Sequence, residues 1–155
     1  MYDEAVEEAL CFGWIDSLPR KLDEEKSMLR FTPRKPKSVW SKLNKSRVEK
    51  LIAEKKMMPA GWETIQTAKK NGSWESLSAS DHAADNNLVP ADLEKAFSRN
   101  KKARENFMRF SVSIRKQFLA WIDLAKRPGT REERIRQTLR MAAAGKKPGP
   151  KGFVL

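Results

Sequence analysis

Cysteine and histidine are nearly absent from this chain of 155 residues, which contains one of each, Cys11 and His82. A single cysteine excludes an intramolecular disulfide. Zinc needs about four cysteine or histidine ligands, or three with a carboxylate, so one copy of the chain cannot build such a site. A Cys11–His82 pair is conceivable as nucleophile and base. The favoured alternative is a buried cysteine and an unrelated loop histidine.

Long apolar runs are absent as well, since no stretch approaches the roughly 18 apolar residues of a membrane span. The opening residues 1–10 are acidic and lack the basic, apolar and small-residue order of a signal peptide. No Walker loop and no Gly-x-Gly-x-x-Gly is present. The sequence therefore predicts a folded cytoplasmic protein with no cofactor, no transmembrane segment and no complete catalytic set.

Positive charge is plentiful and uneven. The net charge of +12 divides into −5 over residues 1–19, +8 over 20–56, −3 over 57–98 and +12 over 99–155. Two basic blocks favour an anionic partner, such as nucleic acid, anionic lipid or an acidic protein surface. A lysine- and arginine-rich solvated surface with no dedicated partner is the alternative.

The first half of the chain predicts a small α+β module over residues 1–78. Residues 3–11 have one apolar face and predict a helix. Residues 12–36 predict a β-hairpin with a polar turn at 23–26, in which Pro19 indicates an edge or a bulge. The capping-box spacing of Ser46 and Glu49 predicts the start of a helix. Residues 59–70 predict another, with Trp62, Ile65 and Ala68 as its apolar stripe.

The second half predicts helices only. Residues 79–87 lack periodicity and are interpreted as a linker, followed by a four-helix module over 88–147. Thr130 and Glu133 repeat the capping-box spacing at the last helix. Residues 148–155 are expected to form a flexible tail. The predicted fold class is α+β, predominantly α-helical, with a short N-terminal hairpin between helices.

Aromatic and basic residues are interleaved in the first basic block. Single-stranded nucleic acid is bound by rings that stack on bases and by cations that contact phosphates. Alternatively, the aromatic residues pack the core and the cations surround them, because tryptophan is highly buried on average. The candidate anion-binding residues of this block are Trp14, Arg30, Arg34, Lys35, Lys37, Trp40, Lys42 and Lys45.

A second basic face is predicted on the last helix. Arg127, Arg131 and Arg134 fall at spacings of four and three and complete the candidate anion-binding set, while Arg136 and Arg140 lie nearby. A basic helix can dock in a groove or on an acidic surface. A solvated helix face is again the alternative.

Several segments resemble the bacterial YdeI/OmpD-associated family, whose members are also called bacteriocin-protection proteins. The segments that carry the resemblance are Tyr2–Asp16, Arg30–Arg34, Ser38–Asn44, Met58–Gly61, Ala68–Lys69, Gly72–Trp74, Ala120–Arg127, Thr130–Arg131 and Gly145–Lys146. Together they cover nearly the whole chain. The resemblance also implies some dozens of residues before the first signature, so we expect the surroundings of Trp14 to be incomplete, with an exposed patch or dimerisation.

The resemblance implies stress resistance, through protection against bacteriocins, and supplies no catalytic residue. Our leading hypothesis is a non-enzymatic cytoplasmic protein that binds an anionic partner, either nucleic acid or an acidic surface. The second hypothesis is a protein–protein adaptor with an apolar interface. The third is an enzyme that uses a lysine or a carboxylate not recognisable from the sequence.

Overall fold

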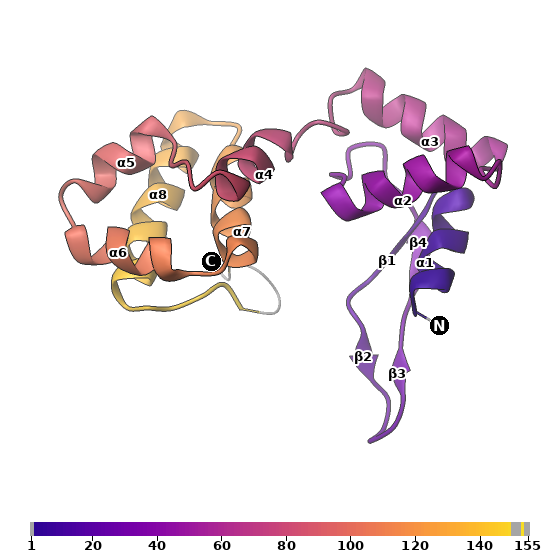
Figure 1. Cartoon of the computed structure of the whole chain (residues 1–155), viewed down its shortest axis with the longest axis horizontal. Helices are drawn as coiled ribbons and strands as arrows, with labels where there is room; N and C mark the ends of the chain where they lie inside the picture. Colours follow the sequence, from indigo (N-terminus) through magenta and orange to yellow (C-terminus); the bar gives the residue numbers. More distant parts are fainter. Residues whose placement is uncertain (1, 150–152, 154–155) are drawn as a thin grey trace. The chain divides into compact units, whose positions relative to one another are not determined.

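The computed structural model describes residues 2–149 and 153 and divides the chain into two units, residues 1–76 and 77–155 (Figure 1). The N-terminal unit contains helices and a small antiparallel hairpin, and the described part of the C-terminal unit contains helices and no β-strand. The prediction of a mostly helical α+β protein with a short N-terminal hairpin is confirmed.

The N-terminal unit is built from three helices around the base of the hairpin. Its core contains Trp40, Val48, Leu51 and Ile65, with relative exposures of 1–2%. The elements are α1 (Tyr2–Cys11), β1 (Trp14–Asp16), β2 (Arg20–Lys21), β3 (Ser27–Met28), β4 (Phe31–Pro33), α2 (Lys42–Ala53) and α3 (Pro59–Lys70).

The hairpin changes register halfway along its length. Near its base, Trp14 pairs with Pro33 and Asp16 with Phe31, whereas farther out Arg20 pairs with Met28. Two residues, Leu18 and Pro19, therefore stand opposite Leu29 alone, which is a β-bulge. Proline suits this position because it has no N–H to donate to the ladder. Beyond the base, β2 and β3 extend away from the helices as a ribbon (Figure 1).

Two glycines allow α1 to end against α3. Gly13 has φ +73°, and a Cβ there would lie 2.3 Å from Thr64 Oγ1. A Cβ on Gly61 would lie 2.3 Å from the carbonyl oxygen of Cys11. The backbones of the two segments are therefore in direct contact at this crossing. A side chain at either position would force α1 and α3 apart.

The start of α2 differs from the prediction. The helix begins at Lys42, and its N-cap is Ser41, whose side chain accepts a hydrogen bond from the Asn44 N–H at 3.2 Å. Ser46 therefore lies inside the helix. The last helix shows the same error, because it begins at Pro128 and contains Thr130. In both cases an upstream residue able to start the helix extends it beyond the capping-box motif.

The C-terminal unit is a helical bundle. Its helices are α4 (Ser78–Asp85), α5 (Ala91–Phe97), α6 (Lys101–Arg109), α7 (Val112–Asp123) and α8 (Pro128–Ala143). Phe107 is fully buried, and its ring centroid lies 5.2 Å from that of Phe97 and 5.8 Å from that of Phe118. Leu93 and Ile122 complete the centre of this core. Of the predicted tail, residues 150–152, 154 and 155 lie outside the described residues.

The predicted linker over residues 79–87 is wrong, because most of it belongs to α4. Ser80 and Ala84, four residues apart, are each 1% exposed and form the inner face of this helix. Arg115 of α7 donates to the Ala84 carbonyl at 3.4 Å and to Asn87 Oδ1 at 2.6 Å. Small residues allow this close packing. Because they are not large apolar side chains, the sequence shows no hydrophobic periodicity that would predict the helix.

Candidate anion-binding groove on the C-terminal unit

Two candidate residues of the first basic block are inside the protein. Trp40 is 1% exposed and Arg34 is 7% exposed, with the Arg34 guanidinium carbon 3.7 Å from the centroid of a Trp40 ring. Arg34 Nη2 donates to the Val39 carbonyl at 2.6 Å, while Nε and Nη1 have no hydrogen-bond partner among the described residues. Burial lowers the pKa of Arg34 to about 10. Neither side chain is placed to contact a base or phosphate.

The other candidates of this block lie at or near the surface. Trp14 is 42% exposed. Lys45 is part-buried, pairs with Glu75 at 3.2 Å and lies 5.5 Å from the centroid of the Trp74 ring. The remaining exposed candidates are Arg30, Lys35, Lys37 and Lys42. Without Trp40, the predicted set is a basic surface with one exposed ring.

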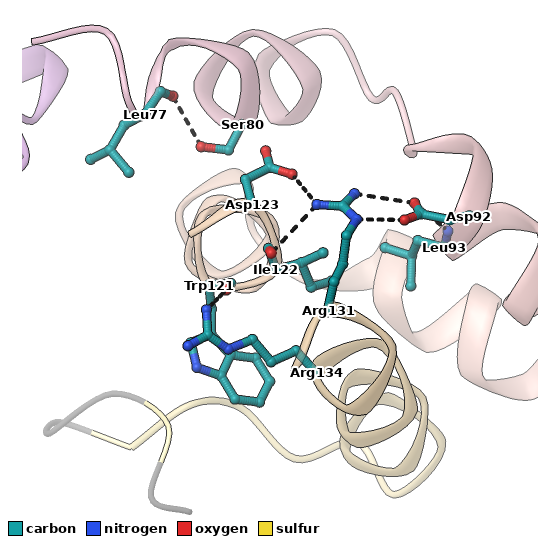
Figure 2. A network of polar contacts seen from close by, with 9 residues as sticks. All are labelled: Leu77, Ser80, Asp92, Leu93, Trp121, Ile122, Asp123, Arg131 and Arg134. Carbon is teal, nitrogen blue, oxygen red and sulfur yellow. Dashed lines mark hydrogen bonds and ion pairs between the residues drawn. The ribbon is translucent and has the colours of Figure 1, made fainter. Parts of the chain in front are cut away.

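Arg131 joins three helices of the C-terminal unit (Figure 2). Its Nε and Nη2 contact the two carboxylate oxygens of Asp92 at 2.6 and 3.2 Å, and Nη1 contacts Asp123 Oδ1 at 2.9 Å. The hydrogen bond to Asp92 is the main cause that raises the pKa of Arg131, and the same bond lowers the pKa of Asp92. With its donors used in this way, Arg131 holds α5, α7 and α8 together.

Arg134 also turns inward. Its Nη1 donates to the Trp121 carbonyl oxygen, and its guanidinium carbon lies 5.3 Å from the centroid of a Trp121 ring (Figure 2). Arg127, the residue before α8, is exposed. Two of the three arginines selected from this helix therefore stabilise the bundle.

A groove on the same unit is formed by α8 and the helices beside it. It consists of two adjoining hollows of about 880 and 590 Å³ that share Arg136. The first is lined by Asn100, Glu133, Arg136, Leu139, Arg140, Ala143 and Ala144. The second is lined by Asp92, Lys95, Ala96, Arg99, Pro128, Arg131, Glu132, Ile135 and Arg136.

One carboxylate organises the cations of the first hollow. Arg136 Nε and Nη2 contact Glu133 Oε2 at 3.0 and 2.6 Å, and Arg140 Nη2 contacts Glu133 Oε1 at 3.2 Å. The hydrogen bond from Arg136, followed by that from Gln137, lowers the pKa of Glu133. The side chains of Arg136 and Arg140 are 66% and 71% exposed. Their guanidinium groups are gathered at the surface rather than locked inside.

The balance of charge in the groove is positive. Five cations and three carboxylates line the two hollows, a net of +2. Lys95 and Arg99 form no ion pair with any residue in the described part of the chain. Leu139, Ala143 and Ile135 supply an apolar floor. This arrangement can accept an anionic group between guanidinium forks while an apolar part of the ligand lies on the floor.

Sequence reasoning selected Arg127, Arg131 and Arg134, whereas the arginines of α8 that line the first hollow are Arg136 and Arg140. Arg136 and Arg140 are separated by four residues and share a face. Lys95 and Arg99 in the α5 region have the same spacing, which was the available signal. Spacing alone could not show that the aspartates of α5 and α7 would occupy Arg131.

Other kinds of site are not evident in residues 2–149 and 153. No three His, Cys, Asp or Glu side chains gather there in a way that could hold a metal ion. None of the helices in this described part has the length and apolar character needed to cross a membrane.

Comparison with protein families separates the two parts of the chain. Residues 1–64 match the model of a domain of unknown function, DUF8412. Residues 88–145 match the model described as bacteriocin-protection, YdeI or OmpD-associated. No curated protein and no solved structure matches the chain. The match to the bacteriocin-protection, YdeI or OmpD-associated model includes every residue that lines the groove.

Proposed function

We propose that this protein binds an anionic partner in the cytoplasm, with nucleic acid phosphate as the chemistry that best fits the groove of the C-terminal unit. The observation that carries the proposal is the set of cations along two adjoining hollows with apolar floors, with Arg136 and Arg140 at the first and Lys95, Arg99 and Arg136 at the second. No serine, threonine, cysteine or histidine is among the described residues that line the two hollows, and the role that we propose is binding.

The arginines of the groove are suited to exchange one anion for another. Exposed ion pairs contribute about 0–1 kcal/mol, so releasing Arg136 and Arg140 from Glu133 costs little. A phosphate accepts two parallel N–H donors from one guanidinium, as a carboxylate does. Glu133 keeps the two side chains close together in the free protein and so lowers the ordering cost of binding.

The family name itself points to bacteriocins, and direct capture of such peptides is not our proposal. A chain with a net charge of +12 repels cationic peptides at long range. Any protective effect would then be indirect, through the anionic partner.

The test is fluorescence anisotropy with labelled single- and double-stranded oligonucleotides at about 50 and 200 mM salt, where phosphate contacts weaken markedly. Arg136→Gln with Arg140→Gln should weaken binding roughly tenfold at low salt. The same change should reduce the slope of log affinity against log salt by about 2, or roughly one for each lost phosphate contact.

The matched control is Lys35→Gln with Lys37→Gln, which removes the same amount of charge from the exposed N-terminal candidate surface. We expect this control to bind nearly as the wild type does. Equal weakening by both double variants would show that overall charge, not the groove, drives binding. No binding of the wild type at low salt would contradict the proposal altogether.

A protein–protein adaptor remains the second candidate, because apolar side chains are exposed on the hairpin. Leu18 and Leu22 are 63% and 64% exposed, and Met28 is 47% exposed. Capture of a specific protein by the wild type, abolished by serine at these three positions, would support the adaptor role. Unchanged capture by that variant would contradict a role for the hairpin.

A further inference from the structure

One face of the hairpin ribbon carries two apolar side chains and two cations. Arg20 and Met28 are directly paired across β2 and β3, so their side chains lie on the same face, and the next pair on that face is Leu22 and Lys26. All four are exposed, and Arg20 and Lys26 form no ion pair with the described residues. We call residues 17–30 the arm.

The arm lacks cover within its own unit. A two-stranded ribbon is marginally stable in water unless its apolar face packs against something. The ladder nevertheless continues past β2, with the Leu22 N–H donating to the Lys26 carbonyl at 2.9 Å, and Asp23 Oδ1 accepts from the Lys26 N–H at 2.7 Å to close the turn. The ribbon is therefore well formed and leaves Leu22 and Met28 exposed to solvent.

A second uncovered apolar surface lies on the same unit. Ala5, Glu8, Ala9 and Phe12 follow the helical spacing of three and four along the outer face of α1, and they line a groove of about 450 Å³ with Trp14 and Phe31. Phe12 is 43% exposed and Trp14 is 42% exposed. We call this hollow the α1 groove. The opposite face of α1, with Val6 and Leu10, is already buried in the core.

The charges of the α1 groove and the arm are complementary. On α1, Asp3 pairs with Arg47 and Glu7 pairs with Lys50, so both carboxylates tie α1 to α2. Glu8 lines the α1 groove and forms no ion pair with the described residues. The α1 groove thus presents apolar side chains with one anion, and the arm presents Leu22 and Met28 beside two cations, Arg20 and Lys26, that form no ion pair with the described residues.

We propose that two copies of this chain associate through these surfaces, with the arm of each copy lying in the α1 groove of the other. Leu22 and Met28 would cover Phe12 and Trp14, and Arg20 would pair with Glu8. The same two patches are used on both copies, so the contact is two-fold symmetric and closes on itself. In such a dimer, the arm of each copy would fill the α1 groove of the other, and that groove would cover the arm.

The first test is sedimentation equilibrium of the full chain at concentrations on the order of 1 to 500 µM, which spans the affinities of weak and moderate dimers. The wild type should form dimers. Leu22→Ser with Met28→Ser should raise the dimer dissociation constant at least tenfold. The matched control, Leu43→Ser with Leu88→Ser, removes two other exposed leucines, and its dissociation constant should equal that of the wild type.

The second test is a charge exchange, which a merely misfolded variant cannot pass. Glu8→Arg and Arg20→Glu should each weaken the dimer several-fold, because like charges then face each other at both contacts. The double variant should recover the wild-type dissociation constant. A wild type that stays monomeric over the whole range, or a double variant no better than the single ones, would overturn the proposal.

The outcome is independent of nucleic acid binding. An apolar contact of this kind should persist at 200 mM salt, where the groove of the C-terminal unit loses its phosphate contacts. The Leu22 and Met28 variant can therefore fail to dimerise while it retains oligonucleotide binding, and the Arg136 and Arg140 variant can show the reverse.

Discussion

Asp92 and Arg131 show how a single ion pair can link several helices. The pair is about one-third exposed, with side-chain exposures of 43% for Asp92 and 30% for Arg131, so its contribution is screened by solvent. Its position matters more than its strength, because Arg131 also reaches Asp123 at the end of α7. Loss of either partner would remove a contact between α5 and α8 and would also leave the other charge without its partner.

The pH dependence of stability should reveal this pair. The pKa of Asp92 is lower in the folded chain than in the unfolded chain, so its contribution is present above the unfolded value near 4 and is lost as pH falls through the folded pKa. Asp92→Asn should therefore lower the free energy of unfolding by about 1 kcal/mol at pH 7. The difference from the wild type should shrink below about pH 3.

Urea unfolding at both pH values measures the effect of Asp92→Asn. Glu105→Gln is the control, because Glu105 is exposed and forms no ion pair within residues 2–149 and 153. Equal effects of the two substitutions at pH 7 would contradict a specific role for Asp92.

Sequence alone could not show which of the candidate side chains are buried. Arg34 and Lys35 are neighbours in a basic segment, yet Arg34 is 7% exposed and lies on Trp40 while Lys35 is exposed. No local pattern separates the two, because the difference arises from how the loop before α2 folds back on the core. Arg131 and Arg134 of α8 illustrate the same limit, because both turn toward neighbouring helices.

At the scale of elements, the caps decide where the helices begin. Ser41 and Ser46 are five residues apart, and only Ser41 caps α2. Ser41→Ala should lower the free energy of unfolding by roughly 1 kcal/mol. Ser46→Ala, inside the helix, should leave it unchanged or raise it slightly, since alanine has the higher helix propensity. Thermal unfolding of both variants tests the assignment, and a larger loss for Ser46→Ala would contradict it.

Elements with strong periodicity were predictable, and elements built from small residues were not. The helices at residues 3–11 and 59–70 were located to within a residue, and the bulge was indicated by Pro19. Within α3, however, Trp62 is 39% exposed, and Gly61 joins Ile65 and Ala68 on the buried face. α4 was missed because its buried face consists of serine and alanine.

For the molecule as a whole, two separate cores imply two separable unfolding events. The buried residues fall into one cluster in each unit. Trp40→Ala should cost the N-terminal core about 3–5 kcal/mol, a large part of the stability of a small domain. Hydrogen exchange should then accelerate at Val48, Leu51 and Ile65 and stay unchanged at Phe107 and Phe118.

Trp62→Ala is the matched control for Trp40→Ala, because Trp62 lies in the same unit and is 39% exposed. It should leave exchange in both units close to that of the wild type. Acceleration throughout the chain in Trp40→Ala would show that the two cores unfold together.

The buried Cys11 has a consequence for how the chain responds to oxidants. The residue is 4% exposed, and burial raises the pKa of its thiol, so little reactive thiolate reaches solvent while α1 stays in place. Cys11 should therefore react slowly with oxidants in the native chain. The rate at which this one thiol is alkylated then reports how often α1 opens, and the measurement needs no engineered cysteine.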